Sequence, residues 1–387
     1  MAPQPPQPIL LVGFTVRMLA ELAVRAGYRV LALDYFGDAD LRALCESISL
    51  LRDYGGTAYS ATALVNVADT LTAPSVVYTA GLENHPGEVA RLARGRQLLG
   101  NMPETLRHVR NPLLLMDTLR ARGFAFPQTF TSQQEVPRAG RRWLWKPLRS
   151  GGGHEVRPWG GAWPSKEGVV QERVPGMVGS AIFVADGRQA VLLGLTEQLV
   201  GVQDFGATGF RYCGNVLPPR LPSDELVDLL GQAQEIVAHL TATFGLRGLN
   251  GVDFVWHEGR VWTIEVNPRP TAAMELVDHA YNLRVFDAHV RSFAGQLPSF
   301  NVERAMAEAP AAGKAILYAP EDLILGDTSD WHAQGLRDIP HPGERILKGH
   351  PVCTILVLGD TPAACLHQLK GRAAEVRAVI SEQQSSC

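Results

Sequence analysis

The sequence predicts a multidomain protein of mixed α/β and α+β class, and three observations support this prediction. The chain has 387 residues and 46% hydrophobic content, which is enough for about two or three sizeable cores. A β-α-β pattern occupies residues 9–34 and is typical of a parallel sheet with a right-handed crossover. Two later stretches, residues 180–196 and 252–266, have instead the pattern of antiparallel hairpins. We expect units of residues 1–101, 102–310 and 311–387.

Composition limits the functions that the chain can carry. Its formal net charge of −3 provides no basic field, so nucleic acid is not expected as a partner. The five cysteines are scattered without metal-ligand spacing, so we expect reduced thiols rather than disulfides or a zinc site. The Pro-rich N-terminus lacks signal-peptide features, and no apolar run approaches the ~20 residues of a membrane span. We therefore expect a soluble, cytoplasmic protein without membrane contact.

The N-terminal unit is predicted to be Rossmann-like. Residues 9–13 and 28–33 are the two strands of the β-α-β pattern, and residues 75–79 read as another strand. A dinucleotide site would need a Gly-x-Gly-x-x-Gly loop after the first strand, but only Gly13 is present, so NAD is not expected. Asp34, Asp38 and Asp40 follow the second strand, at the edge where open α/β sheets bind ligands. For these three residues a polar-substrate site and a solvated acidic loop both stay open.

A candidate anion-binding loop follows the predicted strand at residues 143–147. Lys146 lies near the end of this strand. The residues of the loop that follow it are Gly151, Gly152, Gly153 and His154. A glycine run lets backbone N–H groups approach phosphates, while the lysine adds positive charge.

Shorter patterns predict the rest of the middle of the chain. Pro112 begins a helix that ends before Gly123, and residues 224–244 form a long amphipathic helix. Residues 169–174 are expected to form a strand, and residues 275–294 a helix. Residues 205–215 are expected to form a loop over the site, in which Arg211 either binds a substrate carboxylate or is structural.

The second hairpin carries a candidate metal site. Apolar runs at residues 252–256 and 261–266 flank a His-Glu-Gly-Arg turn. Strand alternation places Glu265 and Asn267 on one face, and the hairpin can fold Asp253 back beside them. Two carboxylates and an amide oxygen are hard ligands that suit Mg²⁺, which usually also takes phosphate oxygens and water. Arg269 can reach an anion held by that metal.

The motif Glu-Val-Asn-Pro-Arg at residues 265–269 resembles the metal-binding motif of ATP-grasp ligases. Asp253, twelve residues upstream of Glu265, matches the spacing in the biotin-carboxylase-like branch of that superfamily. Lys146 with its glycine loop resembles the phosphate-binding lid, and Glu172 and Val174 match the strand and linker that carry the adenine. The resemblance implies an ATP-grasp fold behind the Rossmann-like domain, with ATP and Mg²⁺, or Mn²⁺, as cofactors.

The chain departs from the family pattern at one position. Asn111-Pro112 stands where many ATP-grasp proteins have an Asp-Lys pair whose lysine touches the phosphates, and Arg110 is a candidate substitute. Towards the C-terminus, residues 315–318 and 354–358 read as strands and residues 363–380 as a helix, which predicts a small β-rich segment. Residues 342–351 resemble the closing segment of biotin-carboxylase-type and purine-pathway carboxylases.

The resemblance implies an ADP-forming ligase that activates a carboxylate as an acyl phosphate and joins it to an amine, with Lys146 and Arg269 as catalytic residues. The chain also resembles carboligases found alongside tetrahydromethanopterin-type one-carbon pathways, which implies a role in coenzyme biosynthesis. Two alternatives are a bicarbonate-activating carboligase and a non-catalytic ATP sensor. The expected partners are a small-molecule carboxylate and amine, and a homodimer stays open.

Overall fold

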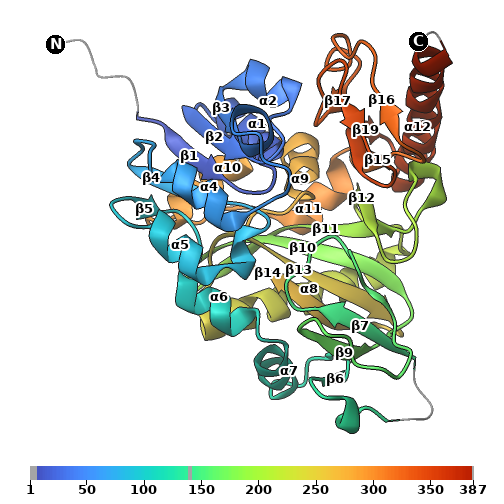
Figure 1. Cartoon of the computed structure of the whole chain (residues 1–387). Helices are drawn as coiled ribbons and strands as arrows, with labels where there is room; N and C mark the ends of the chain where they lie inside the picture. Colours follow the sequence, from blue (N-terminus) through green and yellow to red (C-terminus); the bar gives the residue numbers. More distant parts are fainter. Residues whose placement is uncertain (1–6, 138–141, 386–387) are drawn as a thin grey trace.

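The computed structural model describes residues 7–137 and 142–385. Within these ranges it contains a five-stranded, an eight-stranded, a four-stranded and a small two-stranded sheet (Figure 1). The Pro-rich start up to residue 6 and Cys387 lie outside the described ranges. The five-stranded sheet is parallel and the eight-stranded sheet antiparallel, which confirms the predicted mixture of α/β and α+β structure.

The N-terminal unit is a parallel sheet of strand order β3-β2-β1-β4-β5 with helices packed against it. The residues of β1 and β2 are all buried, and such an unbroken apolar run is typical of a parallel sheet covered on both faces. The predicted strands near residues 9, 28 and 75 are confirmed. The elements are β1 (Ile9–Val12), α1 (Arg17–Arg25), β2 (Val30–Asp34), α2 (Ala39–Leu44), β3 (Glu46–Ser49), α3 (Leu50–Asp53), α4 (Ala61–Ala68), β4 (Ser75–Tyr78), η1 (Leu82–Asn84), α5 (Pro86–Leu92) and β5 (Gln97–Leu98).

A smaller antiparallel sheet of order β6-β9-β7-β8 forms a separate lobe below the large sheet in Figure 1. Its own apolar core includes Trp143, Trp145 and Val170. The predicted helix at Pro112 is confirmed, and the Asn111 side chain caps it by accepting from the N–H groups of its first turn. The elements are α6 (Pro103–Val109), α7 (Pro112–Arg120), β6 (Thr129–Phe130), η2 (Gln133–Glu135), β7 (Trp143–Pro147), β8 (Arg157–Pro158) and β9 (Gly168–Glu172).

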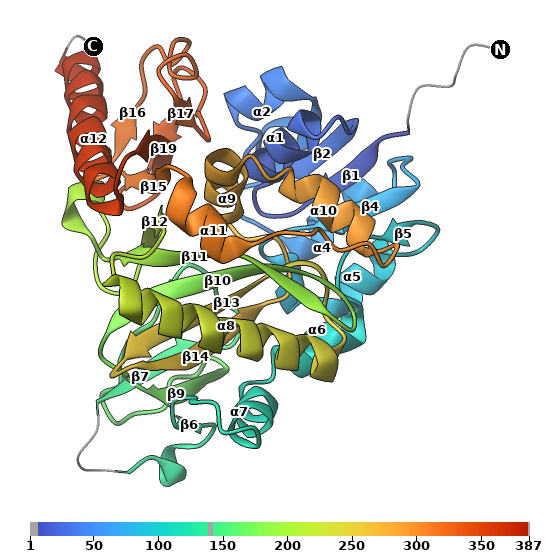
Figure 2. The same ribbon diagram turned by 180° about the vertical axis from the view of Figure 1, so that it is seen from behind.

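The large central sheet has the order β14-β13-β10-β11-β12-β15-β19-β17. The long predicted helix is confirmed as α8, which lies along one face of this sheet (Figure 2) and buries its apolar side against it. The elements up to the end of the hairpin are β10 (Met177–Asp186), β11 (Ala190–Val200), η3 (Gln203–Phe205), β12 (Tyr212–Leu217), α8 (Ser223–Phe244), β13 (Arg247–His257) and β14 (Arg260–Asn267).

The C-terminal strands continue the central sheet, because β15 pairs with β12 and β19 pairs with β15. The strands and helix expected in this segment are therefore present, and the domain boundaries after residues 101 and 310 stay predictions. The remaining elements are α9 (Met274–Tyr281), α10 (Val285–Ser292), α11 (Val302–Glu308), β15 (Ala311–Tyr318), β16 (Leu323–Ile324), β17 (Leu336–Arg337), β18 (Arg345–Ile346), β19 (Pro351–Gly359) and α12 (Pro362–Ser385).

Two segments differ from their predictions. The expected loop at residues 205–215 contains the strand β12, because its backbone is paired on both sides and Gly214 lies directly against the carbonyl of Lys314. The expected helix at residues 275–294 is two helices. Asn282 ends α9 in a left-handed conformation with φ of 49°, and the Asp278 carboxylate accepts from the first N–H of α10.

The solvated-loop interpretation of Asp34, Asp38 and Asp40 is wrong, because all three are buried. Asp34 accepts from two N–H groups of its own unit, and burial raises the pKa of Asp34 to about 7. Asp40 accepts from the N–H groups of Asp338 and Ile339. The Asp34 and Asp40 carboxylates therefore hold backbone segments in place. Asp40 also connects the N-terminal unit to the C-terminal segment.

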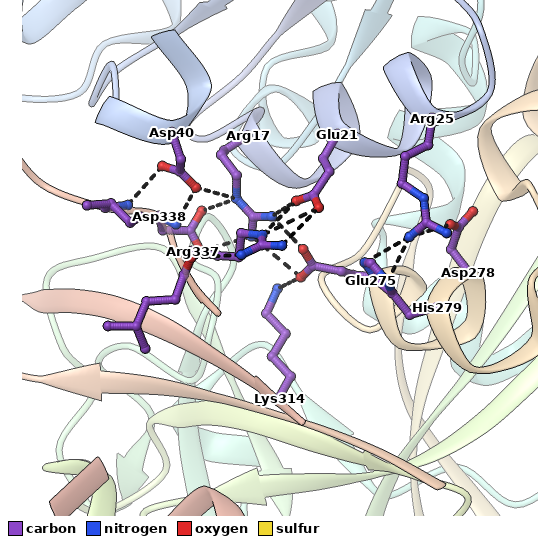
Figure 3. A network of polar contacts seen from close by, with 12 residues as sticks. Arg17, Glu21, Arg25, Asp40, Glu275, Asp278, His279, Lys314, Arg337 and Asp338 are labelled. Atoms are coloured by element: carbon purple, nitrogen blue, oxygen red, sulfur yellow. Dashed lines mark hydrogen bonds and ion pairs between the residues drawn. The ribbon is translucent and has the colours of Figure 1, made fainter. Parts of the chain in front are cut away.

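A buried network of charges joins three parts of the chain (Figure 3). The Arg17 guanidinium on α1 donates to both oxygens of Asp338, at 2.9 and 3.1 Å, and to Glu275 on α9. Lys314 on β15 donates to the other oxygen of Glu275 at 2.6 Å. Burial alone would raise the pKa of Glu275, but Arg17 and Lys314 hold it well below its usual range. The network fixes how the N-terminal unit sits on the central sheet.

Within the described ranges, no helix is both long and apolar enough to span a lipid bilayer. Cys45, Cys213, Cys353 and Cys365 are free thiols, as predicted, and Cys387 falls outside these ranges.

Candidate active site

The metal candidates lie on the β13–β14 hairpin, which turns at Glu258 and Gly259. Both turn residues have positive φ, 48° and 70°, as a two-residue type I′ hairpin requires. The resulting register places Asp253 opposite Glu265 and Gly251 opposite Asn267. The predicted fold-back of Asp253 beside the other two candidates is confirmed.

Asp253 sits in a polar environment formed by three neighbouring strands. Its Oδ1 accepts from the Ser180 hydroxyl at 2.7 Å and from the Gln198 amide at 2.8 Å. Its Oδ2 accepts from the Asn267 amide at 2.9 Å. Burial, together with the negative charge of Glu265, raises the pKa of Asp253 to about 6. A cation between the two carboxylates would relieve this repulsion.

Glu265 is bound by Arg110, which stands at the end of α6. Arg110 also donates to the Asn84 side chain at 2.9 Å and to the Leu148 carbonyl at 3.4 Å, so it joins the hairpin to the N-terminal unit and to the lobe. Burial alone would raise the pKa of Glu265, but Arg110, with help from Lys146 and Arg269, holds it below its usual value. Arg110 thus lies beside the candidate metal ligands. This is the place expected for a substitute for the family lysine that is missing at Asn111-Pro112.

Lys146 points from β7 of the lobe towards the hairpin. Its ammonium donates to the Gln171 side chain on β9 at 2.5 Å, and Gln171 is itself held by the Thr129 hydroxyl at 3.1 Å. Burial lowers the pKa of Lys146 to about 8, although the charges of Glu265 and Asp253 act to raise it. Gln171 is therefore a positioning residue for Lys146. The sequence predicted the strand that contains Gln171 but not this role.

The predicted glycine loop forms a turn beyond Lys146, in which Gly152 and Gly153 have φ of 61° and 69°. A side chain at Gly153 would collide with the Phe210 carbonyl, so only glycine fits there. The Gly152 carbonyl accepts from the Tyr212 N–H at 2.9 Å. Gly151 and His154 are exposed at either end of the turn. The loop is thus anchored to the segment before β12, and its contact with phosphate stays a prediction.

The predicted adenine residues lie where β9 leaves the lobe. Glu172 is the last residue of β9, and its carboxylate accepts from the Gln128 N–H at 3.3 Å. Val174 is half-buried two residues later, in the connection to β10. Both residues therefore lie on the connection between the lobe and the central sheet, and their role in binding adenine stays a prediction.

Arg269 connects the metal hairpin to a residue that the sequence interpretation did not identify. Its guanidinium donates to the Asn267 oxygen at 3.2 Å and to the Glu83 carboxylate at 2.7 Å. Glu83 is 3% exposed and lies on η1, directly after the parallel strand β4. The position after a parallel strand is the signal that could have revealed Glu83. Arg211, by contrast, stacks on Tyr318 and donates to the Gly349 carbonyl, so it is structural here.

The donor set fits a magnesium ion that takes further ligands from a nucleotide. Asp253 and Glu265 are paired across two strands, where like charges repel, and the Asn267 amide oxygen, which accepts from Arg269, is a third candidate ligand. The described residues contain no group of three or more His, Cys, Asp or Glu side chains placed to hold a metal. A metal here would therefore need ligands from outside the chain, and Mg²⁺ commonly completes its shell with phosphate oxygens and water.

Comparisons with known proteins identify a matching domain and a similar fold. Residues 109–273 match the family model described as an ATP-grasp domain. A curated relative, an uncharacterized protein of Methanocaldococcus jannaschii, is 20% identical over 378 residues that cover 90% of this chain and 87% of that protein.

Solved structures share the fold at low sequence identity. The chain superposes with a TM-score of 0.71 and 12% identity on the biotin carboxylase domain of Hydrogenobacter thermophilus 2-oxoglutarate carboxylase, covering 94% of this chain and 89% of that one. It also matches an L-amino acid ligase of Bacillus licheniformis, with a TM-score of 0.67, 13% identity and coverage of 95% and 97%. Against Rhizobium etli pyruvate carboxylase the TM-score is 0.71 at 14% identity, and 95% of this chain spans only 37% of that enzyme.

Proposed function

We propose that this chain, in which residues 109–273 match an ATP-grasp domain and whose fold resembles that of a biotin carboxylase domain, is an ATP- and Mg²⁺-dependent ligase that forms carbon–nitrogen bonds. It activates a carboxylate as an acyl phosphate, transfers the acyl group to an amine, and releases ADP and phosphate. One observation carries this proposal: two facing carboxylates, Asp253 and Glu265, lie beside the cationic side chains of Lys146, Arg110 and Arg269.

The roles follow from the positions of the charges. Asp253, Glu265 and Asn267 would hold Mg²⁺, which supplies charge neutralisation between the β- and γ-phosphates. Lys146 and the N–H groups of residues 151–154 bind the phosphate oxygens, and the exit of β9 at Glu172 and Val174 holds the adenine. Arg110 adds positive charge where the family lysine is missing.

Arg269 stabilises the phosphoryl group during transfer and then the acyl phosphate. It reaches the metal site through Asn267 and the N-terminal unit through Glu83, so it lies between the nucleotide and the acceptor. The carboxylate oxygen attacks the γ-phosphorus and ADP leaves; the amine then displaces phosphate and loses one proton. Preorganised cations are the main source of rate in such phosphoryl transfers.

A bicarbonate-activating carboligase is the second candidate, since the similar 2-oxoglutarate carboxylase domain is in complex with MgADP and bicarbonate. A non-catalytic ATP sensor is the third, and it is motivated by the missing Asp-Lys pair at Asn111-Pro112. A role in making a tetrahydromethanopterin-type coenzyme is a finer proposal, supported only by the resemblance of the sequence to carboligases that accompany such pathways.

The experiment that tests the proposal follows the carboxylate oxygen of the substrate into the products. Purified protein with MgATP and a pool of amines is given ¹⁸O-labelled amino acids or, in a parallel reaction, ¹⁸O-labelled bicarbonate, and phosphate and nucleotides are examined by mass spectrometry. Ligation through an acyl phosphate places ¹⁸O in inorganic phosphate and gives ADP. Label arriving from bicarbonate would indicate the carboligase, and AMP with pyrophosphate would rule out the proposed chemistry. No labelled phosphate from any acid would favour the sensor.

A further inference from the structure

Four aromatic side chains gather at the carboxyl ends of the parallel strands in the N-terminal unit. Phe14 follows β1, Tyr35 and Phe36 follow β2, and Tyr59 precedes α4. Phe14 lies at the centre, with ring centroids 6.0 Å from Tyr35, 4.9 Å from Phe36 and 5.1 Å from Tyr59. The Phe14 side chain is 36% exposed, so part of it is open to a ligand. We call these four residues the aromatic cluster.

The strand order makes this edge a natural binding position. The chain runs from β1 outward through β2 to β3 and then crosses back to β4 on the other side of β1, so the direction of winding changes between β1 and β4. In open parallel sheets, ligands bind in the crevice outside the carboxyl ends at such a switch point.

Two buried polar atoms beside the aromatic cluster lack partners. Among the described residues, neither Glu83 Oε2 nor the Tyr59 hydroxyl has a hydrogen-bond partner. The two are close enough that the Glu83 charge adds to burial in raising the pKa of Tyr59. Gly81, with φ of 98°, brings the backbone directly against the Tyr59 hydroxyl, where a side chain would collide. A buried carboxylate oxygen without a partner costs free energy and is well suited to a donor that arrives with a ligand.

Glu83 also connects the aromatic cluster to the metal hairpin. Its other oxygen, Oε1, accepts from Arg269 at 2.7 Å, and Arg269 donates to Asn267. A group bound at Glu83 Oε2 therefore lies next to the guanidinium that the proposed function assigns to the acyl phosphate. The negative charge at Oε2 disfavours a second carboxylate here and favours a positively charged nitrogen.

We propose that the aromatic cluster and Glu83 form the subsite of the acceptor, and that the acceptor is a primary amine carried on an aromatic ring system. This inference rests on the proposed ligase function. The ring packs edge-to-face or offset against Phe14, and the ammonium donates to Glu83 Oε2. The ammonium first gives one proton to Glu83. The neutral amine then attacks the acyl carbon, a C–N bond forms, the C–O bond to phosphate breaks, and the leaving phosphate takes up the second N–H proton.

The test measures binding to the full chain by calorimetry with four probes. 2-Phenylethylamine carries both the ring and the ammonium; 2-cyclohexylethylamine lacks aromaticity, ethylamine lacks the ring, and phenylacetate carries the opposite charge. We expect 2-phenylethylamine to bind, ethylamine and phenylacetate to bind about tenfold more weakly or worse, and the cyclohexyl amine to be about threefold to tenfold weaker. Equal binding of phenylacetate, or no binding of 2-phenylethylamine, would overturn the proposal.

Three variants assign the binding to this subsite. Phe14→Leu should weaken the binding of 2-phenylethylamine by about threefold to tenfold and leave the binding of ethylamine unchanged, because it removes only the aromatic contact. Glu83→Gln should weaken the binding of both amines by about tenfold or more. Tyr54→Leu changes an exposed aromatic residue of the same unit and should change nothing. If Phe14→Leu binds 2-phenylethylamine as tightly as the unchanged chain does, the aromatic cluster is not the subsite.

MgATP binding distinguishes failure of this inference from failure of the proposed function. If MgATP binds and 2-phenylethylamine does not, the acceptor subsite is wrong while the ligase proposal survives. If MgATP itself does not bind, the ligase proposal fails first. Phe14→Leu should retain MgATP binding, which also shows that the variant is folded.

Discussion

The surroundings of Lys146 are those that the proposed contact with a polyphosphate would require. The lysine is removed from water between the lobe and the hairpin, and burial lowers its pKa to about 8. Such a group is costly to keep charged until an anion arrives, and it then interacts with that anion without a competing water shell. Gln171, the one hydrogen-bond acceptor given to the ammonium among the described residues, fixes its direction but does not neutralise it.

Lys146→Ala should lower turnover by roughly 10²–10³, the scale for loss of one preorganised charge. Folding should persist, because Lys146 is half-buried near the end of β7 and is not part of the apolar core of the lobe. Lys146→Arg keeps the charge and should retain more activity, especially above pH 8, where the lysine loses its proton. Steady-state kinetics between pH 6 and 9 check both expectations. Near-normal turnover in Lys146→Ala would move the main phosphate contact to Arg110.

Asp253 and Glu265 act as one unit because they face each other across two strands. Asp253→Asn and Glu265→Gln should each reduce Mg²⁺-dependent turnover, and the double variant should lose less than the product of the two effects. Titration of activity with Mg²⁺ measures the change in metal requirement. Ser180→Ala, which removes only a hydrogen bond to Asp253, provides a milder comparison. Full activity in the double variant would place the metal elsewhere.

At the scale of elements, the sequence predicted best where a local pattern determines the structure. The hairpin turn, α8 and the strand before the glycine loop depend on neighbours in sequence, and all three are confirmed. The strand β12 was missed because its pairing with β15 depends on residues about 100 positions away. The position of Glu83 after β4 could have suggested it as a candidate, but its pairing with Arg269, 186 residues downstream, has no local signal.

The junction between α1, α9 and β15 depends on charges rather than apolar packing. Arg17, Glu275 and Lys314 are 1%, 0% and 3% exposed, so their ionised forms persist only because each has an opposite partner. Arg17 is forked between Asp338 and Glu275, a geometry that only a guanidinium can provide. The element contacts here are therefore specific but sensitive to the loss of a single partner.

Arg17→Met should destabilise the fold by about 3–5 kcal/mol, because it leaves the buried Glu275 and the half-buried Asp338 with too little positive charge. Denaturant unfolding followed by circular dichroism measures this change. Arg304→Met is the matched control, since Arg304 forms an exposed pair with Glu308 one helical turn away. The control should leave the unfolding free energy nearly unchanged. Equal effects of the two substitutions would mean that the buried network contributes little.

For the whole molecule, the site is assembled from three units rather than contained in one. Lys146 comes from the lobe, Asp253 and Glu265 from the central sheet, and Glu83 with Asn84 from the N-terminal unit. A nucleotide that touches Lys146 and the hairpin at once holds the lobe against the central sheet. Ligand binding should thus stabilise the entire chain and not just one lobe.

MgATP should therefore raise the melting temperature of the full chain, whereas NAD should not. At 100 times its dissociation constant a ligand that binds only the folded state adds ~2.7 kcal/mol, which calorimetry can resolve. ATP with EDTA should stabilise less than MgATP, because Asp253 and Glu265 then repel each other and the triphosphate without a cation. Lys146→Ala should reduce the shift, and Tyr54→Leu should not. A shift with NAD and none with MgATP would show that the chain binds the dinucleotide, although only Gly13 follows β1, and that residues 109–273 do not bind ATP.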